Sequence, residues 1–416
     1  MTPKIVCVAG PTACGKTTLG VLLAQRFHGE VVSADSMQIY RGMTVGTAAP
    51  TEAEMQGVPH HMIAVAEPSE QWSAAEYVAK ATPIVDDILS RGKLPILVGG
   101  TGLWMDALIR GHGFAGGHAG GEVRRELETR FDRDGIEPLL AELRQVDPES
   151  AARLHPADTK RILRALEVYL ETGETISAHN AATRQLPPRY DAVWIGLQFA
   201  DRADMKALID RRVDKMAEEG LLEEVQALLA MGLPRNATAM QAIGYKEFLG
   251  VLDGTLTEQE ALELVKLRSR QYAKRQLTWL RRNPAIHWIY WEKDRDFARA
   301  LQISTEILTA SGLGLAQGRR SSTDRDSVPL AQPLPNKEGA EYYAEKNQFT
   351  GSLPPASSAG AAARHRVFDE RVPDAGHRYR LRSLRGGAGK RRQAAGDLQT
   401  RHFHGGPPSS GGPAGK

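Results

Sequence analysis

The sequence is poor in cysteine and has no long apolar run. Only two of its 416 residues are cysteines, Cys7 and Cys14, and two cannot form the disulfide framework of a secreted protein of this size. No stretch of about 18 apolar residues occurs, and no basic-then-apolar signal segment opens the chain. We therefore expect a protein of the reducing cytoplasm that has no membrane partner.

The sequence also has no Cys/His cluster with the spacing of zinc ligands. Its net charge is too small to identify a binding partner. The formal net charge is only +3, and the 41% hydrophobic and 25% charged residues are those of a globular protein. The basic residues are unevenly distributed, because many of them gather in "LVKLRSRQYAKRQLTWLRRN" (264–283). The length allows two domains and a tail.

Short apolar runs alternate with helical patterns in the part of the chain before residue 111. The strand-like runs are "KIVCVAG" (4–10), "EVVSAD" (30–35) and "PILVGG" (95–100), and "VWIGLQF" (193–199) adds a later one. Such alternation is typical of a mostly parallel sheet covered by helices. After the last run, residues 201–232 form one helical pattern, with Gly232 placed to end it.

Glycine-rich segments divide the chain. "GHGFAGGHAGG" (111–121) interrupts the alternating pattern, and a mainly helical pattern follows from 122 to 169. We predict a core of residues 1–111 with 190–312 and a helical insertion lobe of residues 112–189. The Gly, Ser, Pro and Arg composition of residues 313–416 buries too little apolar surface to offset the entropy of ordering, so we expect a disordered tail.

The stretch "GPTACGKT" has the spacing G-x-x-x-x-G-K-T of a loop that holds phosphates. It follows a predicted strand and precedes a helical pattern, which is the setting of a P-loop NTPase-like, nucleotide- or ATP-binding α/β fold. Its backbone N–H groups and the helix N-terminus favour an anion, Lys16 adds a cation, and Thr17 can ligate Mg²⁺. The candidate phosphate-binding residues are Gly10, Pro11, Thr12, Ala13, Cys14, Gly15, Lys16 and Thr17.

The usual acidic residue of nucleotide hydrolases is missing. The strand in "LPILVGG" runs into Gly99, Gly100 and Thr101 with no carboxylate to hold a metal. Asp35 instead follows another strand, at the edge where parallel sheets bind ligands, although an aspartate there can also cap a turn. Thr101 can donate to a phosphate oxygen or cap a helix, and Arg124 can reach a phosphate or remain at the surface.

Two further segments combine features of nucleic-acid contact. "MQAIGYKE" (240–247) is a short mixed segment between helical patterns, and "QYAKRQLTWLRR" (271–282) interleaves aromatic residues with cations. The cations can form a basic helix face for a phosphate backbone, with Tyr272 and Trp279 stacking on bases. A charged outer face over packed aromatics is the alternative.

Seven motifs, taken in order, resemble those of the tRNA dimethylallyltransferase family, also called tRNA isopentenyltransferases. The resemblance extends over residues 4–310, and the tail has no counterpart in it. The motifs are "GPTACGKT", "SADSMQIYRGMTVGTAAP", "VPHHMI", "LVGGTGLW", "DTKRILRALEVY", "MQAIGYKE" and "AKRQLTWLRR".

The resemblance implies transfer of a dimethylallyl group from dimethylallyl diphosphate to the exocyclic N6 amine of an adenine. That adenine lies 3′ to the anticodon, at tRNA position 37, in tRNAs that read codons beginning with U. Residues Thr12 to Thr17 would bind the diphosphate with Mg²⁺ at Thr17, and Asp35 would take a proton from the amine. Thr101 would assist the leaving diphosphate, and Arg124 would approach it.

The resemblance also implies contacts with the anticodon stem-loop of tRNA. The residues concerned form three segments: Asp35, Ser36, Met37 and Gln38; Thr159, Lys160, Arg161, Ile162 and Leu163; and Met240, Gln241, Ala242, Ile243, Gly244 and Tyr245.

The chain departs from the family pattern at two positions, and two other functions stay open. Cys14 stands where the family commonly has serine, and Trp104 where it has tyrosine. A small-metabolite kinase can use the same loop for ATP, with Asp35 accepting a hydroxyl proton. A noncatalytic RNA-binding protein can retain the loop without its chemistry. We expect a monomer.

Overall fold

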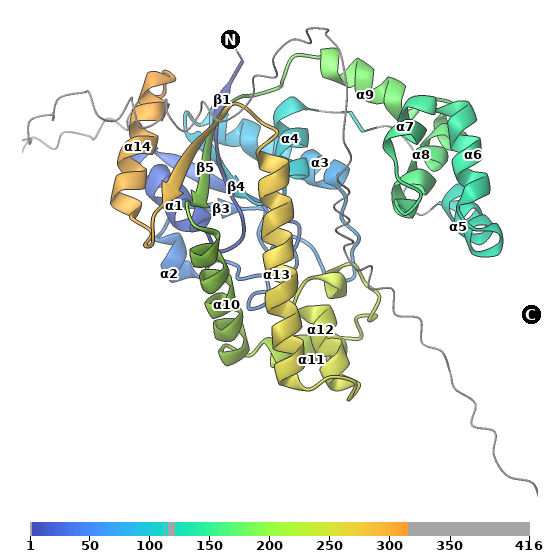
Figure 1. The fold of residues 1–416 in the computed structure, drawn as a ribbon. Helices are drawn as coiled ribbons and strands as arrows, with labels where there is room; N and C mark the ends of the chain where they lie inside the picture. The colour runs from blue at the N-terminus through green and yellow to red at the C-terminus, as the bar shows by residue number, and fades with distance from the viewer. Residues whose placement is uncertain (1, 112, 115–120, 315–416) are drawn as a thin grey trace, which may run out of the picture. The chain divides into compact units, whose positions relative to one another are not determined.

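The computed structural model describes residues 2–111, 113–114 and 121–314. Its centre is a sheet of six parallel strands in the order β3-β2-β4-β1-β5-β6, covered by helices (Figure 1). The strands are β1 (Lys4–Ala9), β2 (Gly29–Ala34), β3 (His60–His61), β4 (Leu94–Gly99), β5 (Asp191–Phe199) and β6 (Ile286–Trp291). The predicted parallel α/β fold is therefore confirmed.

The helices fall into a core set and a lobe set. Those of the core are α1 (Lys16–Phe27), α2 (Glu52–Met55), α3 (Ala74–Ser90), α4 (Gly102–Arg110), α10 (Arg202–Glu218), α11 (Leu221–Ala230), α12 (Tyr245–Leu252), α13 (Glu258–Leu280) and α14 (Phe297–Ala310). Those of the lobe are α5 (Glu122–Asp134), α6 (Glu137–Val146), α7 (Pro148–Arg153), α8 (Thr159–Thr172) and α9 (Ile176–Gln185).

The sheet is buried on both faces, which explains its apolar central strands. Successive residues of β1 point to opposite faces, so Ile5 and Cys7 join one hydrophobic cluster while Val6 and Val8 join the other. Helices α3 and α4 pack on the first face, and α1 with α14 on the second (Figure 1). The candidate site therefore stands on a scaffold packed on both sides.

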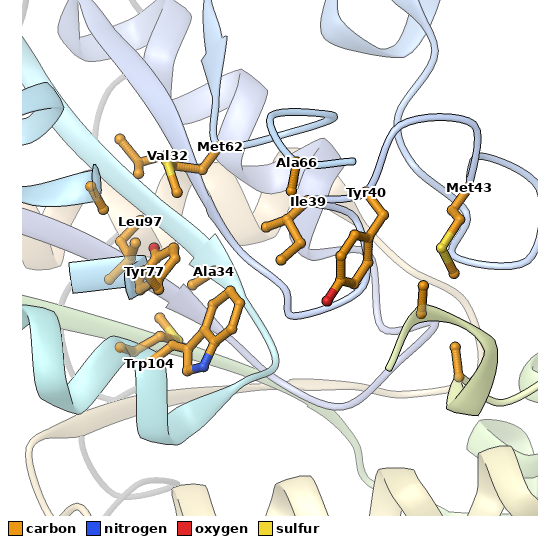
Figure 2. Close-up of a cluster of buried hydrophobic side chains, with 14 of the residues drawn as sticks. Val32, Ala34, Ile39, Tyr40, Met43, Met62, Ala66, Tyr77, Leu97 and Trp104 are labelled. Carbon is orange, nitrogen blue, oxygen red and sulfur yellow. The ribbon is translucent and has the colours of Figure 1, made fainter. Parts of the chain in front are cut away.

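Figure 2 shows part of the cluster on the first face. The rings of Tyr77 and Trp104 are stacked with their centroids 4.4 Å apart. The Tyr77 hydroxyl donates a hydrogen bond to the carbonyl oxygen of Ser33 at 2.9 Å, which ties α3 to β2 just before the end of that strand. Trp104 is only 5% exposed, so the residue that departs from the family pattern fills the core.

Three features differ from what the sequence predicts. Residues 201–232 are not one helix, because Gly220 adopts φ of 94° and separates α10 from α11. The strand β3 has only two residues and so leaves no periodic signal. The strand β6 reads "IHWIYW", with Ile286, Ile289 and Trp291 buried, and its irregular pattern gives no clear strand prediction.

The lobe helices α5 to α9 have a hydrophobic core of their own. It includes Leu127, Leu140, Leu143, Ile162 and Leu166, all of them buried. These helices fall within the predicted insertion of residues 112–189. The predicted disordered tail lies outside the described residues from 315 onward.

Within the described part of the chain, we find no helix that combines the length and the apolar character needed to span a membrane.

A buried carboxylate joins three elements at the start of β2. Glu30 is 2% exposed and accepts hydrogen bonds from Arg91, from Lys93 at 2.6 Å and from the ring of His61 at 2.8 Å. The Arg91 guanidinium is the main reason that the pKa of Glu30 is lowered, with Lys93 and His61 acting in the same direction against burial.

The variant Trp104→Ala should lose about 3–5 kcal/mol of unfolding free energy, because it removes a buried indole and its stacking partner. Leu103→Ala on the same helix is the control, since Leu103 is 52% exposed and its loss should cost less than about 1 kcal/mol. Urea unfolding of the two variants measures both values. Equal losses would contradict the packing described here.

The stability contributed by Glu30 should depend on pH. A carboxyl whose pKa is lowered by folding stabilises the folded state at pH values above its pKa in the unfolded chain, which is about 4.3. This contribution is lost as the pH falls below that pKa. Glu30→Gln should therefore cost about 1.5–3 kcal/mol at pH 7 and progressively less toward pH 3. Urea unfolding across that range tests this, and a pH-independent difference would contradict it.

Candidate active site

The predicted phosphate-binding loop, residues 10–17 and called the phosphate loop below, joins β1 to the start of α1. Gly15 precedes the helix with φ of 89°, and a Cβ there would lie 2.7 Å from the ring of Phe297. The Trp291 indole donates a hydrogen bond to the carbonyl oxygen of Cys14 at 2.9 Å, and Lys16 Nζ donates to that of Pro11 at 2.8 Å. The loop is thus held from β6 and α14, and its N–H groups stand at the N-terminus of α1.

Three cations surround the loop and line a cavity of about 740 Å³: Lys16, Arg212 and Arg295. Arg212 donates to Thr12 Oγ1 at 3.4 Å, and Arg295 donates to the carbonyl oxygen of Ala13 at 3.5 Å. Among the described residues, none of the three forms an ion pair with a carboxylate. With Arg211 and Lys215, the cavity lining holds five cations against three carboxylates, those of Asp35, Glu54 and Glu219. It therefore has an excess of positive charge that an anionic ligand can neutralise.

Burial lowers the pKa of Arg212, and the nearby carboxylate of Asp35 opposes this effect. The guanidinium still remains charged at neutral pH, because its ordinary pKa lies above 12. A partly buried cation without a paired carboxylate is unfavourable by itself. A bound anion would relieve that cost, so Arg212 is a candidate ligand residue that the sequence reasoning missed.

Asp35 follows β2 and lines the same cavity. Its Oδ1 accepts hydrogen bonds from the backbone N–H groups of Met37 at 2.9 Å and Gln38 at 3.4 Å. Within residues 2–111, 113–114 and 121–314 both of its hydrogen bonds go to Oδ1, so Oδ2 can accept a proton from a ligand. Asp35 can therefore cap the turn through Oδ1 and still accept a proton through Oδ2.

Thr101 lies beside Asp35, because β2 and β4 are neighbours in the sheet. The backbone N–H of Thr101 donates to the carbonyl oxygen of Ala34 at 3.2 Å, and Thr101 Oγ1 accepts from the N–H of Ser36 at 3.3 Å. Thr101 occupies the N-cap position of α4, but its side chain forms no capping hydrogen bond there. Thr101 also forms a side-chain hydrogen bond with Tyr272, and it is not among the residues that line the cavity.

A side chain is excluded where nucleotide hydrolases carry the metal-binding carboxylate. A Cβ at Gly99 would lie 2.3 Å from the carbonyl oxygen of Ala34. The close approach of β2 to β4 therefore requires glycine at this strand end. The missing acidic residue is a consequence of how the sheet is built here.

Helix α13 contributes two side chains to the cavity, Tyr272 and Gln276. Burial, followed by the charge of Asp35, raises the pKa of Tyr272 to about 12, so its hydroxyl stays protonated. Gln276 is 5% exposed and hydrogen-bonds to both Thr12 and Gly100. From the sequence, this segment was interpreted as a possible basic helix face. The spacing of Tyr272 and Gln276, four residues apart among apolar positions, was a signal for a second, buried face.

The loop of residues 44–50 forms another wall of the cavity. The carboxylate of Glu224 accepts hydrogen bonds from the N–H groups of Thr44 at 2.7 Å, Val45 at 2.8 Å and Gly46 at 3.0 Å. The side chain of Gln38 donates to the carbonyl oxygens of Thr47 at 3.3 Å and Ala48 at 3.1 Å. The wall is therefore fastened to α11 and to the turn after β2.

The predicted tRNA segment from Met240 to Tyr245 is largely covered by protein. Gln241 is its one exposed residue, whereas Met240 and Tyr245 are fully buried. The Tyr245 hydroxyl donates to Glu224 at 2.5 Å, and burial together with that carboxylate raises the pKa of Tyr245. This segment thus supports the loop of residues 44–50.

Two groups of predicted residues lie in the lobe. Arg124 pairs with Glu128 at 2.7 Å, with Glu167 4.0 Å away, and it is absent from the lining of the cavity. In the segment Thr159 to Leu163, Lys160 and Arg161 are exposed while Ile162 and Leu163 are packed in the lobe core. The contacts of these residues with tRNA and diphosphate remain predictions.

A larger cavity of about 950 Å³ borders the amino ends of β1 and β5. Trp279, Asp106 and Arg282 are among its lining residues, and the Trp279 indole donates to Asp106 at 3.1 Å. The phosphate loop does not line it. We place the chemistry in the smaller cavity, because the loop, Asp35 and the three cations converge there.

The chain matches two family models, described as IPP transferase over residues 38–283 and as isopentenyl transferase over residues 3–69. A tRNA dimethylallyltransferase of Caldanaerobacter subterraneus is 46% identical over 291 residues, which are 70% of this chain and 92% of the relative. A tRNA dimethylallyltransferase of Symbiobacterium thermophilum is 48% identical over 285 residues, which are 68% of this chain and 88% of the relative.

Solved structures agree with these relatives. A full-length tRNA isopentenylpyrophosphate transferase from Bacillus halodurans has a TM-score of 0.56 and 40% identity, covering 75% of this chain and 98% of its own. A eukaryotic dimethylallyltransferase acting on tRNA has a TM-score of 0.64 at 28% identity, covering 76% of this chain and 82% of its own.

Arg212→Leu should weaken the binding of inorganic diphosphate with Mg²⁺ by about 10- to 100-fold, because it removes a charge-assisted contact worth about 1.5–3 kcal/mol. Arg202→Leu, an exposed position on the same helix, should leave the affinity unchanged. Isothermal titration calorimetry measures both. Equal affinities for the two variants would show that Arg212 does not face the anion.

Proposed function

The chain belongs to the tRNA dimethylallyltransferase family, and on that premise we propose the following reaction. The enzyme transfers the dimethylallyl group of dimethylallyl diphosphate to the N6 amine of the adenine 3′ to the anticodon, at tRNA position 37. Its substrates are tRNAs that read codons beginning with U, and diphosphate is released. The observation that carries the proposal is the convergence of Asp35 and three cations on one cavity at the carboxyl edge of the sheet.

The phosphate loop binds the diphosphate of the prenyl donor in this proposal. The backbone N–H groups at the start of α1, Lys16, Arg212 and Arg295 face the phosphate oxygens and neutralise their charge. A nucleotide is not required, and the glycine enforced at position 99 agrees with this, because it leaves no carboxylate for ATP hydrolysis. The small-metabolite kinase is therefore the weaker alternative.

Mg²⁺ fits the oxygen donors of this cavity. The Thr17 hydroxyl lines it, and Mg²⁺ commonly binds through one or two protein oxygens plus phosphate. The described residues contain no group of three His, Cys, Asp or Glu that could hold a metal without a ligand. When bound at Thr17, the ion would add positive charge at the diphosphate.

The transfer forms one bond and breaks another. The amine nitrogen of adenine bonds to the first carbon of the dimethylallyl group, and the bond from that carbon to the diphosphate oxygen breaks with its electron pair leaving on the diphosphate. Asp35 Oδ2 accepts the proton that the amine loses. Thr101 and Lys16 stabilise the charge that grows on the leaving group.

The target adenine has to leave the base stack to enter this cavity, as bases do in other base-modifying enzymes. We propose that the exposed Lys160 and Arg161 of the lobe and the basic residues of α13 hold the anticodon stem-loop by its phosphates. The protein would act as a monomer in the cytoplasm. Its two cysteines, both free and buried, agree with a reducing compartment.

Asp35→Asn should lower kcat for tRNA prenylation by about 10²- to 10⁴-fold with little change in tRNA affinity. Asparagine keeps Oδ1 as the acceptor for the turn but cannot take the proton. The matched control is Asp201→Asn, because Asp201 accepts from the N–H of Ala203 at 2.8 Å in a similar turn and is exposed. Steady-state prenylation and RNA binding assays measure both variants.

Full activity of Asp35→Asn would remove Asp35 as the base. Loss of RNA binding with the activity would give it a structural role instead. A noncatalytic RNA-binding protein would show no prenylation even with the unchanged sequence.

A further inference from the structure

The side-chain amide of Gln276 joins the phosphate loop to the end of β4. Its Oε1 accepts a hydrogen bond from the backbone N–H of Thr12 at 2.8 Å, and its Nε2 donates to the carbonyl oxygen of Gly100 at 3.1 Å. If the amide were reversed, its NH₂ group would face the N–H of Thr12 and its oxygen would face the carbonyl oxygen of Gly100. These two partners therefore define a single orientation of the amide. The amide is buried, which makes each of its hydrogen bonds costly to lose.

The chain leaves space for this amide. A Cβ at Gly100 would lie 2.0 Å from Gln276 Nε2, so only glycine admits the side chain in its observed place. Thr12 belongs to the phosphate loop, and the residue after Gly100 is Thr101. One side chain therefore bridges the two strand ends that the proposed reaction uses.

The same helix also presents charge to solvent. Lys274 and Arg275 are exposed on α13, immediately before Gln276, and the Arg275 guanidinium lies 5.7 Å from the centre of the Tyr272 ring. Tyr272 is one helical turn before Gln276 and lines the cavity with it. A polyanion bound to the exposed face of α13 would therefore act on the helix that holds the phosphate loop.

We propose that Gln276 is a positioning residue that couples RNA bound on the basic face of α13 to the phosphate loop, so that each substrate strengthens the binding of the other. The inference rests on the proposed function for the identity of the two ligands. Coupling of this kind is reciprocal, so the diphosphate should tighten RNA binding by the same factor as the RNA tightens diphosphate binding.

The test measures the dissociation constant of inorganic diphosphate with Mg²⁺, with and without an anticodon stem-loop RNA. The unchanged protein should bind diphosphate about 5- to 100-fold more tightly with the RNA present. Gln276→Leu should reduce this factor to near one and raise the KM for dimethylallyl diphosphate, while the dissociation constant of the RNA without diphosphate stays within about twofold. Gln259→Leu, an exposed glutamine on the same helix, is the control and should retain the coupling.

Gln276→Glu adds a readout that a merely structural role would not change. An ionised carboxylate still accepts from Thr12 but repels the carbonyl oxygen of Gly100, whereas the protonated form restores the donor. The raised KM for dimethylallyl diphosphate should therefore recover, relative to the unchanged protein, as the pH is lowered from 8 to 6. This profile decides the matter if Gln276→Leu does not fold.

The inference would be overturned if RNA still tightened diphosphate binding in Gln276→Leu. It would also be overturned if the KM of Gln276→Glu for dimethylallyl diphosphate, divided by that of the unchanged protein, did not change with pH. The proposed function fails separately, if the unchanged protein forms no prenylated adenine. The coupling measurement requires no reaction, so the two failures can be told apart.

Discussion

The pairing of β4 between β2 and β1 is the constraint on which the candidate site depends. Parallel strands end at the same edge, so this order brings together Asp35 after β2, Thr101 after β4 and the phosphate loop after β1. The hydrogen bond from Thr101 to Ala34 and the glycine required at position 99 show how closely the first two ends approach. Both faces of the sheet are packed, so this geometry is rigid.

Charge then determines what the edge can bind. Lys16, Arg212 and Arg295 converge on the loop without a carboxylate partner among the described residues. Partly buried cations of this kind favour an anion with several oxygens, such as a diphosphate. Asp35, in contrast, stands close enough to Arg212 to influence its pKa and keeps one oxygen for a proton. In the proposed reaction, the leaving group and the nucleophile would thus be served from different strand ends.

The sequence predicted the parts of this site that depend on local patterns. The strand runs, the loop spacing and the positions of Asp35 and Thr101 after their strands follow from short-range periodicity and were sufficient to predict the fold. Arg212 and Gln276 were missed, because their roles arise from contacts with residues more than 150 positions away. The burial of Tyr245 was not predicted either, because it depends on packing against another helix, from which Glu224 accepts its hydroxyl hydrogen bond.

Mass spectrometry of tRNA nucleosides tests the central claim most directly. The protein would be incubated with unmodified tRNA, Mg²⁺ and either dimethylallyl diphosphate or ATP. We expect a prenylated adenine and stoichiometric release of diphosphate with dimethylallyl diphosphate, and no consumption of ATP when ATP replaces it. Consumption of ATP without prenylated adenine would contradict the central claim.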